Sequence, residues 1–201
     1  MNEEEKERRQ QILEAAFTEF SSKGFDRATI KSIAKAAGLQ SPSLIYWYFP
    51  TKEELLQAVI IAQSLLFQAA FNPEAVIDLP PETLLPMMAQ GYLYMVQQPK
   101  VQQMARLLFS EALRRPELSD MISQNIMGRV LSFLKNYLNH QIQIGQLRPH
   151  DVRASARAFI GMLVPYALGL VLFPGLNGDS LTADEHIATN LTIFLNGLKA
   201  T

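Results

Sequence analysis

The chain has 201 residues, of which 48% are apolar and 18% are charged. This composition excludes a disordered chain and supplies enough apolar side chain for one or two folded domains. Cysteine is absent, which excludes disulfide scaffolds and thiolate metal sites. The net charge of -1 excludes a protein that coats nucleic acid by overall positive charge.

Two segments bear on where the protein resides. Residues 1–11 are polar and charged, without the apolar core of a secretory signal, so we expect a cytoplasmic protein. Residues 158–178 carry no charge and approach the length of a membrane-spanning helix. Gly161, Pro165 and Gly169 interrupt this stretch, and no basic cluster follows it. We therefore expect no membrane insertion, but a helix buried on one face and covered by a partner subunit on another.

Helical periodicity runs through the chain, and no segment shows the alternation of a strand. Gly24, Gly38 and Gly145 are placed to end helices by adopting a left-handed turn. The residues predicted to cap helix N-termini are Thr29, Ser41, Thr51, Asp151 and Thr182. The predicted helices, about nine in total, cover residues 4–23, 30–37, 42–48, 51–71, 81–98, 100–113, 116–144, 151–173 and 182–199.

The first three predicted helices have the arrangement of a helix-turn-helix unit. A short helix ends at Gly38, and the next one begins with small polar residues. Residues 27–52 contain four basic residues and no acidic one, with Lys31 and Lys35 on the outer side of the second helix. A helix-turn-helix presents the first residues of its second helix to base edges in the major groove. We therefore predict a DNA-binding domain at residues 1–52.

Four consecutive aromatic residues end the third predicted helix. Because successive helical residues turn by about 100°, the four side chains cannot all face one core. Ile45 and Phe49 are four residues apart and are expected to pack inward. The hydroxyls of Tyr46 and Tyr48 are suited to phosphate oxygens, whereas for Trp47 core packing and DNA contact are equally open.

Six short segments between residues 8 and 60 form a recognisable set: 12–16, 23–25, 28–30, 33–38, 43–46 and 48–55. Together they resemble the TetR family of bacterial transcriptional regulators. The resemblance implies an all-α fold, in which a three-helix DNA-binding unit precedes a larger helical domain at residues 53–201. It also implies that Thr29, Tyr46, Tyr48 and Lys52 contact phosphates. Lys52 has independent support, because it begins a helix whose N-terminus already favours an anion.

The region departs from the family pattern in two ways. The stretch from Gly38 to Phe49 is one residue longer than the common spacing, an insertion that we place at Gln40. Pro42 and Ser43 stand where many relatives have Lys or a small residue followed by Gly. Gln40, Ser41 and Ser43 then remain as base readers, supplemented by DNA shape. The predicted DNA contacts are Thr29, Lys31, Gln40, Ser41, Pro42, Ser43, Tyr46, Trp47, Tyr48 and Lys52.

The resemblance also implies that the C-terminal domain holds a small effector. Methionine and aromatic residues on inward helix faces suit an adaptable apolar pocket, although plain core packing is an alternative for each of them. Glu111 and Asp120 could serve a cationic ligand, but we expect both to be exposed. The predicted pocket residues are Phe67, Met88, Tyr92, Met95, Met104, Leu108, Met127, Leu131, Phe159, Met162 and Tyr166.

The last two predicted helices are too apolar for one chain to cover. Pairing them with their copies would form an isologous four-helix interface, with two DNA-reading heads about one DNA turn (roughly 34 Å) or a multiple apart on a palindrome. The predicted interface residues are Leu163, Leu170, Ile187, Leu191, Phe194, Leu195 and Leu198.

Catalysis finds little support in the sequence. No phosphate-binding loop, nucleophile elbow or acid pair is present, and the three histidines lack metal-ligand spacing. We expect no catalytic residue, metal or cofactor. Two hypotheses remain: a homodimeric repressor released from palindromic double-stranded DNA by a mostly apolar effector, or a helical dimer that carries small molecules or binds proteins without reading DNA sequence.

Overall fold

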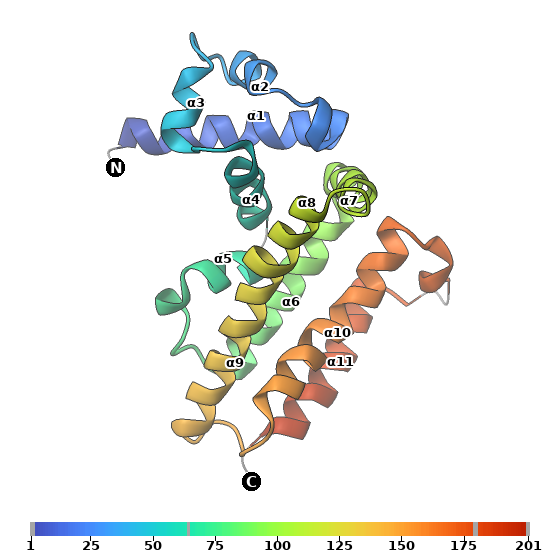
Figure 1. Cartoon of the computed structure of the whole chain (residues 1–201). Coiled ribbons are helices and arrows are strands. Elements are labelled where there is room, and N and C mark those ends of the chain that lie inside the picture. The colour runs from blue at the N-terminus through green and yellow to red at the C-terminus, as the bar shows by residue number, and fades with distance from the viewer. Residues whose placement is uncertain (1–2, 64, 179–180, 200–201) are drawn as a thin grey trace.

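The computed structural model describes residues 3–63, 65–178 and 181–199. Within these ranges the chain forms eleven α-helices and no β-strand, which confirms the all-α prediction. Figure 1 shows a small N-terminal unit placed across one end of a larger bundle of long helices.

The N-terminal unit contains helices α1 (Glu3–Arg27), α2 (Ile30–Ala36) and α3 (Ser43–Tyr48). The expected end of the first helix is confirmed, because Gly24 has a positive φ of 80° and breaks the helical geometry inside α1. Only the short turn of residues 25–27 follows before α2 begins. Helices α2 and α3 are short because a glycine turn and an aromatic run with a proline end them.

Helix α4 (Lys52–Ala62) connects the N-terminal unit to the larger bundle, and α5 (Leu65–Phe71) follows it (Figure 1). The prediction of one helix over residues 51–71 is therefore wrong. Gln63 ends α4, and residue 64 lies outside the described part of the chain. The capping hydroxyl of Thr51 accepts a hydrogen bond from the Glu54 backbone N–H at 3.1 Å, as expected.

The larger bundle also differs from prediction between residues 116 and 144. A π-helical segment, Met121–Met127, divides the single helix expected there. The wider turn is visible in the hydrogen bond from the Gly128 N–H to the Ser123 carbonyl, five residues back. The bundle helices are α6 (Pro81–Gln97), α7 (Pro99–Ala112), α8 (Pro116–Asp120), α9 (Gly128–Gln143), α10 (Val152–Val171) and α11 (Ala183–Leu198), with short 3-10 helices at Pro73–Ala75 and Pro174–Asn177.

The loop before α6 is fastened to α9 by two buried polar side chains. The Tyr137 hydroxyl donates to the Leu79 carbonyl at 2.7 Å, and the Gln141 amide donates to the Ile77 carbonyl at 3.0 Å. Buried polar groups need such partners, so these bonds fix the loop against the bundle without leaving the two donors unsatisfied.

Helix α10 is the apolar segment noted in the sequence. It is long and apolar enough to cross a membrane by length and composition, a test that core helices of soluble proteins also pass. Phe159 and Leu163 on one side are buried in the core, whereas Gly161 and Pro165 on another side are exposed. The helix therefore has an inner face that is covered by its own chain and an outer face that is not.

The structure corrects the predicted dimer interface. Four of its residues are buried inside a single chain, so they belong to the protomer core and do not face a partner: Leu163, Ile187, Leu191 and Leu198. The other three, Leu170, Phe194 and Leu195, are half-buried. Apolar periodicity identified the buried face of each helix but could not indicate which chain covers it.

Candidate DNA-binding surface and effector pocket

The start of α3 presents an exposed surface that contains most of the predicted base readers. Ile45 and Phe49 retain only 0% and 4% of their surface and anchor α3 to α1 and α2, which confirms their inward orientation. Because these two residues fix the rotation of the helix, most of the side chains before and between them point outward, with Tyr48 as the exception. The predicted DNA contacts that are exposed on this surface are Gln40, Pro42, Ser43, Tyr46 and Trp47, and Leu44 is exposed beside them.

Ser41 and Ser43 are ordered by each other. Their hydroxyl oxygens lie 2.7 Å apart, and the Ser41 oxygen also accepts from the Ser43 backbone N–H at 3.3 Å. The N-cap position of α3 is Pro42, which makes no side-chain cap bond, so the prediction that Ser41 occupies the cap is wrong, although its hydroxyl still accepts from the first helical N–H. One hydroxyl must donate to the other, so the pair keeps one hydroxyl hydrogen for an outside acceptor.

Trp47 is the most exposed large aromatic side chain of the N-terminal unit. It keeps 67% of its surface, and its only described ring partner is Tyr48, edge-on at 4.8 Å. The packing alternative for Trp47 is therefore wrong. Tyr48 itself is half-buried and packs against the core, while Tyr46 is exposed.

The second helix is capped as the sequence predicts. The Thr29 hydroxyl accepts from the Ser32 N–H at 3.0 Å, and the Ser32 hydroxyl accepts from the Thr29 N–H at 3.1 Å. Thr29 remains exposed, as do Lys31 and Lys35 on the outer side of α2. The basic side chains of α2 and the Ser43 and Tyr46 side chains of α3 are thus open to solvent.

Lys52 begins α4 as expected, but its ammonium group has partners within the chain. The Nζ atom donates to the Asp26 carbonyl at 3.4 Å and lies 4.3 Å from the centre of the Phe25 ring. Burial lowers the pKa of Lys52, and nearby acidic groups only partly offset this effect. The side chain is therefore part of the contact between α1 and α4.

Glu111 is buried where α7 meets α1, which corrects the expectation that it is exposed. Its Oε1 atom accepts from the Asp26 N–H at 3.4 Å, and its Oε2 atom has no partner among the described residues. Arg115, just beyond α7, reaches back to the Asp26 carboxylate at 2.8 Å. We call Gly24, Asp26, Lys52, Glu111 and Arg115 the junction, because they join the DNA-binding unit to the bundle. Asp120 is exposed, as expected.

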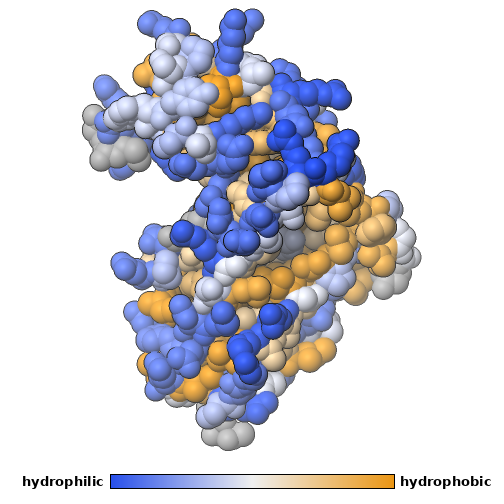
Figure 2. Space-filling model, viewed as in Figure 1, coloured by the Kyte–Doolittle hydropathy of each residue, from blue (hydrophilic) through white to orange (hydrophobic). Residues whose placement is uncertain are grey.

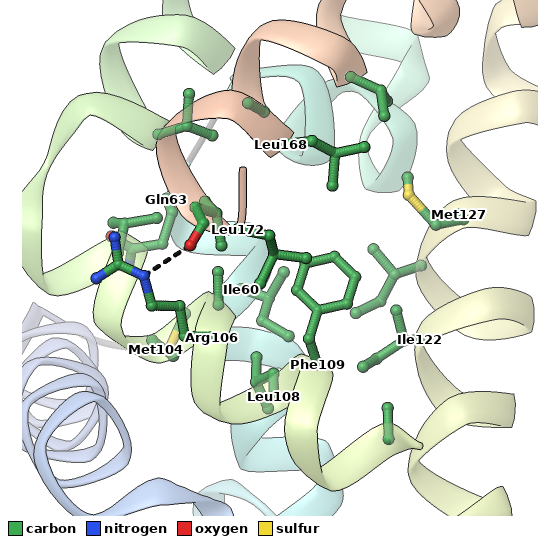
Figure 3. Close-up of a pocket in the computed structure, with 18 of the residues that line it drawn as sticks. Ile60, Gln63, Met104, Arg106, Leu108, Phe109, Ile122, Met127, Leu168 and Leu172 are labelled. Atoms are coloured by element: carbon green, nitrogen blue, oxygen red, sulfur yellow. Dashed lines mark hydrogen bonds between the residues drawn. The ribbon is translucent and has the colours of Figure 1, made fainter. Parts of the chain in front are cut away.

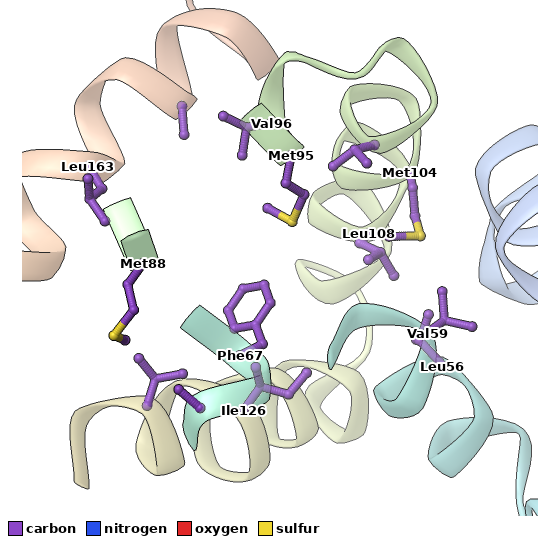
Figure 4. Packing of buried hydrophobic residues seen from close by; sticks show 14 of the residues in the cluster. Leu56, Val59, Phe67, Met88, Met95, Val96, Met104, Leu108, Ile126 and Leu163 are labelled. Atoms are coloured by element: carbon purple, nitrogen blue, oxygen red, sulfur yellow. The ribbon is translucent and has the colours of Figure 1, made fainter. Parts of the chain in front are cut away.

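The bundle encloses an apolar cavity of about 980 Å³ between α4, α6, α7, α10 and the π-helical segment (Figure 3). Six predicted pocket residues line this cavity: Phe67, Tyr92, Met95, Met104, Leu108 and Met127. Figure 4 shows Phe67, Met95, Met104 and Leu108 close together, at the edge of the buried core. Methionine and aromatic side chains thus serve as both core and cavity wall.

The other five predicted pocket residues lie outside the cavity lining. Met88 and Phe159 are fully buried in the core, and Leu131 packs against it. The Tyr166 ring lies tilted against the His186 ring, and His186 is hydrogen-bonded to the Met162 carbonyl. Sequence reasoning missed residues that turn toward the cavity only in the folded bundle, including Ile60, Val101, Phe109, Ile122, Ile126, Leu168 and Leu172. Leu163, expected at a dimer interface, also lines the cavity.

The exposed lining residues mark an open side of the cavity, which we call its mouth, where the middle of α7 meets the last turn of α10. The Arg106 guanidinium joins them, donating from Nε to the Val171 carbonyl at 2.7 Å (Figure 3). Its Nη2 atom also donates to the Leu170 carbonyl at 3.2 Å. Around this clamp the apolar side chains of Phe109 and Leu172 are exposed. Figure 2 shows hydrophobic residues over this larger domain, whereas the N-terminal unit is mostly hydrophilic on the same side.

The described part of the chain holds no group of three or more acidic, histidine or cysteine residues able to bind a metal ion. The geometry instead combines an exposed helix-turn-helix with an apolar cavity in a separate helical bundle.

Comparison with known proteins agrees with this arrangement. Residues 12–59 match the family model described as bacterial regulatory proteins of the tetR family, and residues 83–197 match the model of the AefR-like transcriptional repressor C-terminal domain. The transcriptional regulator SrpR of Pseudomonas putida is 29% identical over 161 residues, which cover 80% of this chain and 73% of SrpR. UidR of Escherichia coli K12 is 23% identical over 202 residues, covering 98% and 96% of the two chains.

A crystal structure of a TetR-family regulator from Mesorhizobium loti shares the fold, with a TM-score of 0.67 and 22% identity over 96% of this chain and 98% of that one. The two family models cover the DNA-binding unit and the bundle separately. The chain therefore belongs to the TetR family and is a DNA-binding transcriptional regulator.

Proposed function

We propose that the protein is a cytoplasmic homodimeric repressor that binds a palindromic operator and leaves it when a small, mostly apolar effector enters the cavity. The observation that carries this proposal is the position of α7. One face of α7 lines the cavity through Met104 and Leu108, and another face packs against α1 of the DNA-binding unit. A ligand that displaces α7 therefore acts directly on the element that positions α1.

On the DNA side, Gln40, Ser41 and Ser43 read base edges, and Trp47 makes an apolar contact in the groove. The exposed Lys31 and Tyr46 bond to phosphates, and so do Thr29, Tyr48 and Lys52, while Pro42 starts the recognition helix at the required angle. The exposed part of this set occupies one acid-free segment, which suits the negative potential of a duplex.

Dimerisation uses the outer faces of α10 and α11. Gly161 and Pro165 leave α10 open to a close approach, and Ile193 keeps 68% of its surface on α11. Phe194 and Leu195 are half-buried and can complete their burial against a second copy. This pairing covers the apolar surface that would otherwise remain on α10, so no membrane is needed to explain its composition.

Release follows from contacts at the junction. The Glu111 side chain on α7 holds the Asp26 N–H, and Arg115 holds the Asp26 carboxylate. Movement of α7 by a ligand shifts both groups and with them the end of α1. In a dimer this changes the distance between the two recognition helices, which must match the spacing of half-sites.

The test is selection of bound fragments from random DNA at about 0.15 M salt, a physiological ionic strength. The repressor proposal predicts enrichment of one palindrome whose half-sites lie about one helical turn, or a multiple of it, apart. Enrichment of no shared sequence would overturn operator reading and favour the carrier alternative. Enrichment of single half-sites would overturn binding as a homodimer.

A second measurement separates the roles of two lysines. Lys31→Ala should weaken binding to all sequences similarly and reduce the salt slope of log K by about 1, because one phosphate contact is lost. Lys52→Ala should do the same and also lower thermal stability, because the Lys52 ammonium bonds to Asp26 and covers Phe25. An unchanged salt slope in Lys52→Ala would remove Lys52 from the phosphate contacts and leave it a junction residue only.

A further inference from the structure

We propose that the effector is an uncharged, largely apolar molecule that carries a hydrogen-bond acceptor, and that the Tyr92 hydroxyl is the donor that selects it. This inference rests on the proposed function of the cavity as an effector site. It names the chemistry of the ligand and one residue that determines specificity.

The charge of the cavity lining excludes strongly charged ligands. No acidic side chain lines the cavity among the described residues, so a permanent cation would lose its hydration without gaining a counter-charge. Arg106 is the single basic lining residue of that set, and it is exposed at the mouth with its Nε and Nη2 donors bound to carbonyls of α10. An anion deep in the cavity would therefore also be buried without a partner.

The polar groups of the lining are few, and most are already used or lie at the mouth. The Gln63 amide donates to the Val59 carbonyl at 3.1 Å. The Ser123 hydroxyl donates to the Asp120 carbonyl at 3.3 Å, and the Ser110 hydroxyl accepts from Arg114 at the same distance. These two serines are exposed, as is the third lining serine, Ser119. The inner part of the cavity is left with very few polar groups for a ligand.

Tyr92 on α6 is the exception. Its ring packs edge-on against Phe67, another wall residue, with centroids 6.4 Å apart. The Tyr92 hydroxyl forms no hydrogen bond with any residue of the described chain. The contrast with Tyr137 is informative, because that buried hydroxyl is satisfied by the Leu79 carbonyl at 2.7 Å. A half-buried phenol in a cavity wall, without a hydrogen-bond partner among the described residues, points to a ligand atom as its partner.

The protonation state of Tyr92 determines whether its oxygen donates or only accepts in this hydrogen bond. Burial raises the pKa of Tyr92 to about 12, so the hydroxyl keeps its proton at neutral pH. A phenol in this state can donate to a carbonyl, ether or hydroxyl oxygen of an apolar molecule. The volume of about 980 Å³ lies near the upper end for small-molecule sites, which allows ligands with several rings or a long chain.

The experiment uses N-phenylnaphthylamine, an uncharged fluorescent probe, with the full-length protein. Naphthalene and acetonaphthone then compete with the probe. Acetonaphthone adds one carbonyl acceptor to the same rings, so the difference between the two affinities measures how much that acceptor contributes to binding. We expect acetonaphthone to bind the wild type more tightly, and Tyr92→Phe to weaken acetonaphthone by roughly two- to tenfold, the usual range for one hydrogen bond. Naphthalene affinity should stay within about twofold, since Tyr92→Phe keeps the ring.

A matched control is Tyr94→Phe, because Tyr94 lies on the same helix, is 71% exposed and does not line the cavity. It should leave both competitors unchanged. An unchanged acetonaphthone preference in Tyr92→Phe would overturn the role of Tyr92. For the charge argument, anilinonaphthalene sulfonate should bind at least about tenfold more weakly than N-phenylnaphthylamine, a loss of the order expected for an unpaired buried charge.

Equal affinity for the sulfonate would overturn the prediction of an uncharged ligand, and so would failure of the wild type to bind any of the uncharged aromatics. The proposed function is tested separately, by adding acetonaphthone to the operator complex. Binding of acetonaphthone without release of DNA would contradict effector control and leave the ligand chemistry intact. Loss of palindrome selection would contradict the repressor proposal without affecting either binding result.

Discussion

The DNA-binding unit and the helical bundle of this protein carry their functional residues in opposite ways. In the unit, the candidate contacts of α3 are exposed, and two buried side chains, Ile45 and Phe49, determine which way they point. In the bundle, the candidate contacts line a cavity whose walls come from helices far apart in sequence, from Ile60 to Leu172. A surface site therefore depends on a few local anchors, whereas a cavity depends on how long helices pack.

The two regions meet at the junction, where polar contacts replace apolar packing. Glu111 is buried there with one oxygen unpaired, and Gly24 lies so close that a methyl group on it would stand 2.6 Å from the Glu111 Oε1 atom. This contact connects a cavity wall to the DNA-binding unit through a buried carboxylate at the end of the Glu111 side chain. It is the place where the independence of the two regions can be tested.

The largest expected effect comes from removing a local anchor, with Ile45→Ala. Truncating this fully buried side chain should lower the free energy of unfolding of the N-terminal unit by about 2–5 kcal/mol and abolish operator binding. Affinity of the bundle for N-phenylnaphthylamine should change by less than about twofold, which is within the spread of small context effects. Urea unfolding and probe titration check both expectations, with the exposed Leu44→Ala as the control for the loss of stability only. Parallel loss of DNA and probe binding would show that the two regions fold as one unit.

A smaller effect is expected at Gly24 in the junction, and Gly38, a second glycine with positive φ that lies outside the junction, provides the comparison. Gly38 has φ 67° and open space around it, so Gly38→Ala should cost only backbone strain, about 1–2 kcal/mol. Gly24 has φ 80° and faces Glu111, so Gly24→Ala should cost about 2–4 kcal/mol, strain plus overpacking. The measurement is urea unfolding of both variants.

A double variant identifies the source of the difference. In a Glu111→Ala background, the cost of Gly24→Ala should fall because the crowded carboxylate is gone, but the strain of a backbone with φ 80° and ψ 169°, a region essentially restricted to glycine, should remain. Because Glu111 also holds the Asp26 N–H, its removal should uncouple effector binding from DNA release. Equal costs of Gly24→Ala with and without Glu111 would show that the two residues do not interact across the junction.

Sequence patterns predict the DNA-binding unit better than the bundle. Helix ends in the DNA-binding unit depend on local signals such as the positive φ of Gly24 and Gly38 and the cap at Thr29, and all three are confirmed. The exposed position of Trp47 could not be decided from its neighbours alone. The partners of Lys52 could not be foreseen either, because Phe25 and Asp26 approach it only after α1 folds back onto α4.

In the bundle, periodicity located the inward faces but could not separate core from cavity. Met88 and Met95 lie on the same helix, yet Met88 is enclosed by the core and Met95 faces the cavity. No proline or glycine marks the π-helical segment Met121–Met127, whose wider turn sets the direction of Ile122 and Ile126. The burial of Glu111 likewise depends on a contact with residues 85 positions away in sequence.

The smallest expected effect concerns the capping box, a local feature that occurs in both regions and can be compared between them. Thr29 and Thr182 each cap a helix through a reciprocal capping box, but only the second box contains a titrating group. Glu185 accepts from the Thr182 hydroxyl at 2.7 Å and from its N–H at 2.9 Å. The hydroxyl bond, followed by the backbone bond, holds the pKa of Glu185 below its ordinary value.

A carboxyl with a lowered pKa in the folded state stabilises the fold above its unfolded pKa of about 4.3, and this contribution is lost as pH falls through the folded pKa. The destabilisation by Thr182→Ala should therefore shrink between about pH 5 and pH 3. Thr29→Ala should cost about 1 kcal/mol throughout, because its partner Ser32 does not titrate. Urea unfolding across this pH range checks both variants. A constant cost for Thr182→Ala would mean that the Glu185 charge adds nothing to its cap, and that the two regions use the same device with the same strength.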